Sequence, residues 1–186
     1  MVYGAGHGPL CVCCCTAAQV GAVTRGRGMG MKVSEASIST CVFTMPVEST
    51  TEPEFIDVTD TVSGYIRESG ILNGFCLVFS KHTTAAITIQ ENEPLLLQDL
   101  SKLLEDFSPR RAKYSHNDFA VRTVNMHEDE CPNGHSHCRH LILGSSETIP
   151  VIDGALALGQ FQRLFVVELD EESPNPREIL VQLMGV

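Results

Sequence analysis

The fold is decided by a stretch in the middle of the chain, residues 75–90, which reads FCLVFSKHTTAAITIQ. Its first part, Phe75–Phe79, is a continuous β-prone run of the kind found in strands buried on both faces. In its last part Ile87 and Ile89 alternate with polar residues, which predicts a second strand. A short polar link that contains His82 joins the two predicted strands.

On either side of this stretch, helical periodicity alternates with strand patterns. A helix that begins at Pro94 carries one apolar stripe and ends before Ser108, and a shorter amphipathic helix is predicted over 56–66, with Gly70 after its last turn. We expect a short helix over 133–143 and further strands over 34–45, 119–124, 149–152, 155–158, 164–169 and 179–184. This mixture predicts an α+β domain, a two-layer and largely antiparallel β-sandwich with helices.

Composition and charge narrow the classes of protein that remain. The chain has 186 residues, of which 43% are hydrophobic and 19% charged, enough for one domain with a hydrophobic core. Its formal net charge of −10 excludes a nucleic-acid binder that works by neutralising phosphates. The sequence has no uninterrupted apolar stretch of about eighteen residues, so we expect no membrane span.

The first 33 residues differ from the rest of the chain. They contain Arg25, Arg27 and Lys32 but no acidic residue, and they are rich in glycine. Because such a segment offers little to bury, we predict a disordered leader over 1–33 and a single domain over 34–186. An organelle address is the alternative function for this leader.

Cysteine usage indicates a reducing compartment. Half of the eight cysteines stand in the leader, at Cys11, Cys13, Cys14 and Cys15. Two more fall inside apolar strand patterns, where cysteine behaves as a small buried residue. This spacing does not form a disulfide framework, so we expect a cytoplasmic location.

Histidines are the most informative residues for function. Six of the seven lie between residues 82 and 140, mostly in polar segments at the ends of predicted elements. His82 follows a strand, His116 lies in a turn-like stretch, and a third group consists of His135, His137 and His140. Histidine is the side chain most often used for metal binding and for proton transfer near neutral pH.

Three interpretations of the third group stay open. The first is a structural zinc site, although ligands bunched within eight residues rarely close a tetrahedron unaided; its ligands would be Cys131, His135, His137 and Cys138. The second is a set of solvated helix-face histidines without a function. The third combines one of them with His82 and His116, since three imidazoles from separate elements leave a fourth position open, as catalytic zinc sites do.

Other polar residues stand near predicted strand ends. Glu91 and Asn92 lead into the helix that begins at Pro94, where acidic and amide side chains act as helix caps. A carboxylate that orients a ligand histidine is the functional alternative for Glu91. The turn Gly159–Gln162 either only permits the backbone to reverse or offers amide donors to a phosphate-like ligand.

Four ordered motifs carry a resemblance to a known family. They are His82–Ile89 with the Glu91-Asn92 pair, Tyr114–Asn117, Asn133–His137, and Gly154–Gln162. They resemble the His-Thr-Ser/Thr-Ala, Tyr-x-His-Asn, Asn-Ala/Gly-His-x-His and Gly-x-Leu-x-Leu-Gly-x-Trp-Gln motifs of the YjbQ-like family, the secondary thiamine-phosphate synthase enzymes. The resemblance covers about residues 35–186, and Phe161 stands where the family has tryptophan.

The resemblance implies a YjbQ-like α+β sandwich that assembles as a homotrimer, with a site between subunits that holds a metal or an anion. It implies that the metal ligands are His82, His116 and His137, with His135 a weaker candidate. It also implies that the catalytic residues are Glu91, Asn92 and Gln162.

The activity that the resemblance implies joins hydroxymethylpyrimidine diphosphate to thiazole phosphate and releases pyrophosphate. Such chemistry calls for a divalent cation, and three histidines favour zinc, whereas a diphosphate substrate favours magnesium. The expected partner is therefore a small phosphorylated metabolite. A metal-dependent hydrolase of a phosphorylated metabolite and a non-enzymatic metal- or metabolite-binding module are the alternatives.

Overall fold

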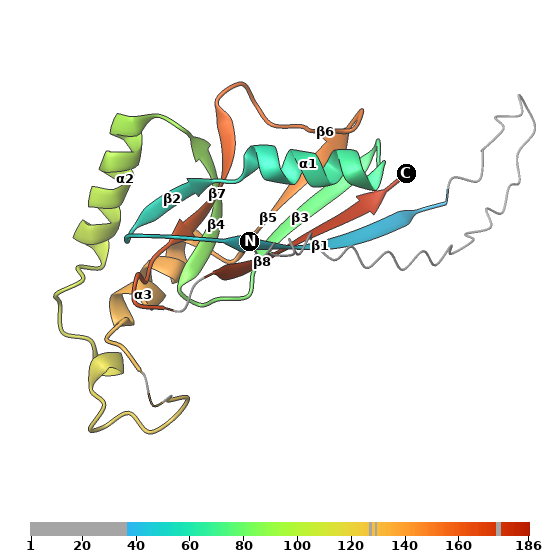
Figure 1. The fold of residues 1–186 in the computed structure, drawn as a ribbon. Helices are drawn as coiled ribbons and strands as arrows, with labels where there is room; N and C mark the ends of the chain where they lie inside the picture. Colours follow the sequence, from blue (N-terminus) through green and yellow to red (C-terminus); the bar gives the residue numbers. More distant parts are fainter. Residues whose placement is uncertain (1–36, 127, 129, 174–175) are drawn as a thin grey trace, which may run out of the picture.

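The computed structural model describes residues 37–126, 128, 130–173 and 176–186, so the predicted leader, 1–33, lies outside the described residues. The described part is an α+β fold in which two antiparallel sheets are covered by helices (Figure 1). The strands are β1 (Ser39–Val47), β2 (Glu54–Asp57), β3 (Gly74–Ser80), β4 (Ala85–Glu91), β5 (Ser146–Ile152), β6 (Ala155–Leu156), β7 (Gln162–Glu168) and β8 (Arg177–Gly185). The helices are α1 (Thr59–Ser69), α2 (Pro94–Phe107), the 3₁₀ helix η1 (Ser115–Asn117) and α3 (Gly134–Leu143).

The strands form one large and one small sheet. The five-stranded sheet has the order β1-β8-β3-β5-β6, and the three-stranded sheet has the order β2-β7-β4. The stretch 75–90 contributes to both, because β3 pairs with β5 and β8 while β4 pairs with β7. The polar link that contains His82 therefore crosses from one sheet to the other.

The two faces of the small sheet pack against different parts of the molecule. One face, with Ile87, Leu164 and Val166, joins the main core together with α1 and the inner face of the five-stranded sheet. The opposite face, which includes Phe165 and Val167, packs against α2 and α3. Alternation of side chains along each strand allows this two-sided burial, and it places α3 directly behind the small sheet.

The structure confirms most of the predicted elements. Helix α2 begins at Pro94 and ends at Phe107 as predicted, and α3 spans Gly134–Leu143. The predicted helix over 56–66 is displaced, because residues 54–57 form β2 and helix α1 begins at Thr59. The pairing of β2 with β7, more than a hundred residues later, is a long-range contact that local periodicity does not report.

Two strand predictions are wrong or too long. Residues 119–124 form turns and bends, and their apolar side chains Val121 and Val124 are 75% and 69% exposed. These side chains have no sheet face to pack against, so the segment forms no strand despite its β-prone composition. The predicted strand 155–158 shrinks to the two residues of β6.

The outer face of the five-stranded sheet is apolar and open. Phe75, Phe79 and Val42 point outward from β3 and β1 and are 41%, 37% and 37% exposed. Their cross-strand neighbours on β8 include Met184 and Leu180. An antiparallel sheet with one solvated face normally has polar residues on that face, so this surface is of the kind used for association.

Helices long and apolar enough to cross a bilayer were not found among the described residues.

Candidate functional site

The start of α3 is fixed against η1 by very close packing at Gly134. A Cβ atom added to Gly134 would lie 2.6 Å from Tyr114 Cβ and 2.9 Å from Tyr114 Cγ. The Gly134 amide donates a hydrogen bond of 2.9 Å to Asn117 Oδ1. Glycine is required because only a residue without a side chain lets the Tyr114 side chain lie this close to the backbone of α3.

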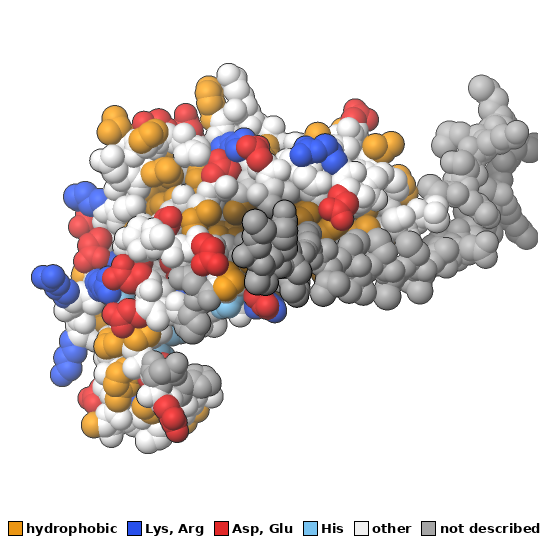
Figure 2. Space-filling view, viewed as in Figure 1, with side chains coloured by type: hydrophobic (Ala, Val, Ile, Leu, Met, Phe, Trp, Pro, Cys, Tyr) orange, Lys and Arg blue, Asp and Glu red, His pale blue; other side chains and the backbone are white. Residues whose placement is uncertain are grey.

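This packing brings two of the predicted ligands together. The rings of His116, on η1, and His137, on α3, lie edge to face with their centroids 4.6 Å apart and an interplanar angle of 70°. Figure 2 shows histidine atoms in pale blue near the place where the lower lobe of the molecule meets its body. The structure thus pairs two histidines that stand twenty-one positions apart in the sequence.

Two properties of this pair favour metal binding: the lowered pKa of His137 and an unpaired ring nitrogen on His116. Burial, followed by the nearby His116 ring, lowers the pKa of His137 below its ordinary value. The Nε2 atom of His116 is buried and has no hydrogen-bond partner among the described residues. A neutral imidazole with an unused ring nitrogen is the form that coordinates divalent metals.

Asp170 and Asn133 lie beside the pair. Asn133 Nδ2 donates a hydrogen bond of 3.0 Å to Asp170 Oδ2, and Asp170 is one of the charges that act on His137. The other amide atom of Asn133, Oδ1, is buried without a hydrogen-bond partner in the described part of the chain. The pair is thus bordered by an unused carbonyl acceptor, which could receive a proton donor of a ligand.

Cys131 is close to the site but remains a thiol. Its Sγ lies 3.9 Å from both carboxylate oxygens of Asp170. Burial, followed by the Asp170 charge, raises the pKa of Cys131 to about 11. The thiolate needed for zinc binding is therefore disfavoured at neutral pH.

The third predicted ligand lies in a separate place. His82 is in the link between β3 and β4, and its Nε2 accepts a hydrogen bond of 3.0 Å from the Glu178 amide on β8. The pKa of His82 is lowered, first by burial and then by the positive charge of Arg177. Across residues 37–126, 128, 130–173 and 176–186, no three His, Cys, Asp or Glu side chains gather into a metal site.

The predicted catalytic residues form another group at the far end of β4. Glu91 is directly opposite Gln162 in the pairing of β4 with β7. Strand β4 has seven residues and begins three residues after His82, which places Glu91 about 20 Å along the strand from His82. Among the described residues, Glu91, Asn92 and Gln162 make no hydrogen bond or ring contact with His116 or His137.

The contacts of these three residues are local. Asn92 donates a hydrogen bond of 2.9 Å to Asp57, and Gln162 Oε1 accepts one of 2.7 Å from the Gly159 amide. Glu93, and not Glu91, caps α2 by accepting from two amides of the first turn. Glu91 is exposed and takes no part in capping α2, which was the alternative role predicted for it.

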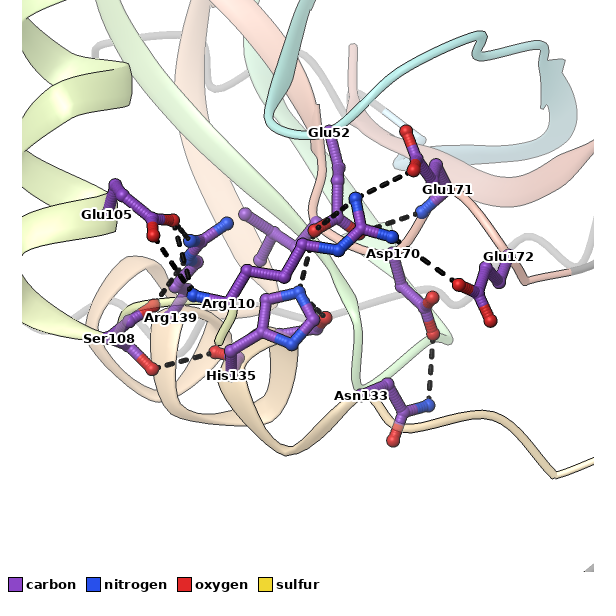
Figure 3. Close-up of polar contacts among 12 residues, drawn as sticks. Glu52, Glu105, Ser108, Arg110, Asn133, His135, Arg139, Asp170, Glu171 and Glu172 are labelled. Carbon is purple, nitrogen blue, oxygen red and sulfur yellow. Dashed lines mark hydrogen bonds and ion pairs between the residues drawn. The ribbon is translucent and has the colours of Figure 1, made fainter. Parts of the chain in front are cut away.

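The cysteine-flanked zinc interpretation does not fit the position of His135. Its side chain is 98% buried and points to Glu52, with Nε2 lying 2.6 Å from Glu52 Oε1 (Figure 3). Burial alone would raise the pKa of Glu52, but hydrogen bonds from His135 and the Glu171 amide hold it below its usual value. His135 therefore joins α3 to the segment before β2.

Sequence reasoning missed this carboxylate cluster. Figure 3 shows Arg110 reaching Glu52, Glu171 and Glu172 from one side while His135 meets Glu52 from below. Glu52 stands in a short acidic segment without any motif, so only its burial, which comes from tertiary packing, identifies it. Asp170 was missed for the same reason.

A pocket of about 350 Å³ is lined by other residues, among them Gln90, the neighbour of Glu91 on β4. It sits between α2, α3 and the outer face of the small sheet, and its lining is almost entirely apolar, with Leu103, Phe107 and Ile142 at its walls. It contains none of the predicted site residues, and the histidine pair is the better candidate for chemistry because it has unused polar atoms.

Fold and site together define an α+β sandwich protein with paired histidines at the start of its third helix. The chain belongs to the YjbQ-like UPF0047 family, whose sequence profile matches residues 43–186. The UPF0047 protein of Methanothermobacter thermautotrophicus is 42% identical over 141 residues, which cover 76% of this chain and 90% of the relative. YugU of Bacillus subtilis is 29% identical over 143 residues, or 76% of this chain and 98% of YugU.

Solved structures show the same fold. A YbjQ-like protein of unknown function from Sulfolobus solfataricus P2 superposes with a TM-score of 0.71 at 31% identity, covering 80% of this chain and 99% of that one. A family protein from Clostridium acetobutylicum has a TM-score of 0.64 at 30% identity, with coverage of 75% and 98%. The expected YjbQ-like α+β fold is thus confirmed.

Proposed function

We propose that this protein is an enzyme that holds a divalent metal, zinc first, on His116 and His137 and acts on a small phosphorylated metabolite. One observation carries the proposal: the two rings lie 4.6 Å apart while the buried Nε2 of His116 is left without a partner among the described residues. Buried polar atoms are nearly always paired, so an unpaired one next to a second histidine marks a ligand position. The proposed reaction is the thiamine-phosphate synthesis that the family resemblance implies.

The donor set fits a borderline metal better than magnesium. Imidazole nitrogens suit zinc and similar ions, while magnesium prefers oxygen ligands. When bound, such an ion neutralises developing charge on a phosphate or diphosphate group. Asn133 Oδ1 can accept a hydrogen bond from the same ligand, and Asp170 keeps the Asn133 amide in place by accepting a hydrogen bond from Nδ2.

We propose that the protein assembles as a homotrimer, because the predicted catalytic residues make no hydrogen bond or ring contact with the histidine pair among the described residues of one chain. From a neighbouring copy, Glu91, Asn92 and Gln162 could act on a ligand of the pair. The open apolar face of the five-stranded sheet, with Phe75 and Phe79, supports association of this kind.

A metal-dependent hydrolase of a phosphorylated metabolite is the second candidate. It is favoured by the lowered pKa of His137, because neutral imidazoles leave the metal its full charge for activating a water molecule. We also propose a cytoplasmic location, since Cys76, Cys131 and Cys138 are free thiols.

The test combines metal analysis with two activity assays on the full chain. Zinc content and zinc affinity are measured for the wild type, His116→Ala, His137→Ala and the control His140→Ala, a histidine of the same helix. Product is then sought from hydroxymethylpyrimidine diphosphate with thiazole phosphate, and phosphate release from a panel of phosphorylated metabolites. Zinc that is retained by both His116→Ala and His137→Ala would refute the site, and zinc binding without turnover would indicate a non-enzymatic binding module.

A further inference from the structure

The hydrogen bond at His82 determines which of its ring nitrogens carries the proton. The Glu178 main-chain N–H lies 3.0 Å from His82 Nε2. A main-chain N–H can only donate, so Nε2 must be the acceptor and must be free of hydrogen. In a neutral imidazole the proton is then on Nδ1, and this tautomer follows from the geometry alone.

The same bond occupies the lone pair that a metal would need. A neutral imidazole has one lone pair in the ring plane for coordination, and that of His82 already receives the Glu178 hydrogen. Nδ1 carries the proton and offers no lone pair. His82 therefore does not fit the third ligand position beside His116 and His137 in this arrangement.

Nδ1 of His82 is an unused donor. It makes no hydrogen bond to another described residue and belongs to a half-buried ring, while the main-chain N–H of His82 is held by Ser80 Oγ at 3.2 Å. Ser80 on β3 and Glu178 on β8 belong to the five-stranded sheet, so the ring is oriented by that sheet rather than by a ligand. A fixed N–H donor without a partner is suited to an anionic oxygen.

The charges around His82 are two positive and two negative, and they are paired as Arg177 with Glu168 and Lys81 with Glu178. Arg177 and Lys81 both lower its pKa after the larger effect of burial, although Glu168 and Glu178 oppose them. Arg177 is itself held by Glu168 through Nε at 2.7 Å. A neutral imidazole in this position can still donate a hydrogen bond to an anion through Nδ1–H.

Asp170 connects His82 to the histidine pair. Arg177 Nη2 donates a hydrogen bond of 3.2 Å to the Asp170 main-chain carbonyl oxygen. The Asp170 carboxylate accepts a hydrogen bond from Asn133 Nδ2, beside His137. Asp170 thus contacts both Arg177, whose charge acts on His82, and Asn133 beside His137.

We infer that His82 binds an anionic group of the substrate, such as a phosphate, through Nδ1–H, and that it is not a metal ligand. This inference rests on the proposed function for the metabolite, but the tautomer and the missing ligand role do not depend on it. In this arrangement His116 and His137 bind the metal, and His82 binds the anion.

The first experiment reads the tautomer directly. Long-range ¹H–¹⁵N correlation spectra of the full chain should show Nδ1 of His82 as the protonated nitrogen and Nε2 as the unprotonated one, unchanged when zinc is added. His116 and His137 should shift on zinc addition. A zinc-induced shift of His82 Nε2, or a proton on Nε2 in the metal-free protein, would overturn the inference.

The second experiment uses matched substitutions and two probes, zinc and inorganic phosphate. The side-chain amide of His82→Asn overlays Nδ1, so it should keep phosphate binding, whereas His82→Ala should weaken it about tenfold. Both variants should retain zinc, as should the control His140→Asn. Loss of zinc from His82→Asn would show that His82 is a ligand.

A third variant covers the case in which His82→Ala does not fold. His82→Gln places its amide at Nε2, where it can still accept from Glu178 through its oxygen but leaves the Nδ1 position empty. It should lose phosphate binding while keeping zinc; retained phosphate affinity would contradict the role of Nδ1. If instead His116→Ala and His137→Ala keep zinc, the proposed metal site fails while the His82 tautomer stands.

Discussion

Gly134→Ala is the substitution that best tests how the histidine pair is built. Its new Cβ would meet Tyr114 Cβ at 2.6 Å and Asn117 Oδ1 at 3.0 Å, so the segment that carries His116 must move away from α3. Overpacking of this kind costs about 1–3 kcal/mol, of which the better helix propensity of alanine returns at most about 1 kcal/mol. We expect a net loss of about 1–2 kcal/mol in the free energy of unfolding.

The loss should appear in two measurements. For a chain of this size, about 1–2 kcal/mol corresponds to a fall in Tm of roughly 2–8 °C in differential scanning calorimetry. Zinc affinity, measured by titration calorimetry, should fall about tenfold or more because the two ligands are moved apart.

Gly64→Ala is the matched control. A Cβ at Gly64, inside α1, meets only the flexible end of Arg67 at 3.8 Å. The same substitution should there raise the free energy of unfolding by roughly 0.5–1 kcal/mol and leave zinc affinity unchanged. If Gly134→Ala behaves like Gly64→Ala in both assays, close packing at α3 does not position the site and the reasoning fails.

Three further predictions concern other parts of the molecule. Glu52→Gln should destabilise the protein by about 2 kcal/mol at neutral pH, because it removes a buried charged acceptor of His135. The pKa of Glu52 is lowered in the folded protein, so its contribution to stability is complete above the unfolded value near 4.5 and is lost as the pH falls through the folded pKa. Acid unfolding curves of the wild type and the variant should therefore converge at low pH. Phe79→Glu should dissociate the oligomer in light scattering, and an unchanged mass would exclude the five-stranded sheet face as the interface. Cys131 should react slowly with iodoacetamide at pH 7.5, because its pKa is raised to about 11; labelling as fast as that of a free cysteine in the unfolded chain would contradict this.

Local patterns predicted the elements that are stabilised mainly by their own periodicity. The leucine stripe after Pro94 gave α2 at its observed bounds, since an amphipathic helix needs only one apolar face and a proline at its start. The strand over Phe75–Phe79 was found from its β-prone run, but the expected burial on both faces was wrong, because Cys76 and Val78 enter the core while Phe75 and Phe79 are exposed. Clustering of histidines at element ends also indicated His82, His116 and one member of the group His135, His137 and His140, and the family resemblance selected His137 from that group.

The order of most elements, the family and the candidate histidines could therefore be predicted from the sequence. Tertiary structure alone decided how they are used, because hydrogen-bond partners are chosen across long distances in the chain. Residues 54–57 become a strand only by pairing with β7, whereas residues 119–124 have no such partner and stay irregular. The role of His82 depends on an amide 96 residues away, which takes the one lone pair that a metal would need.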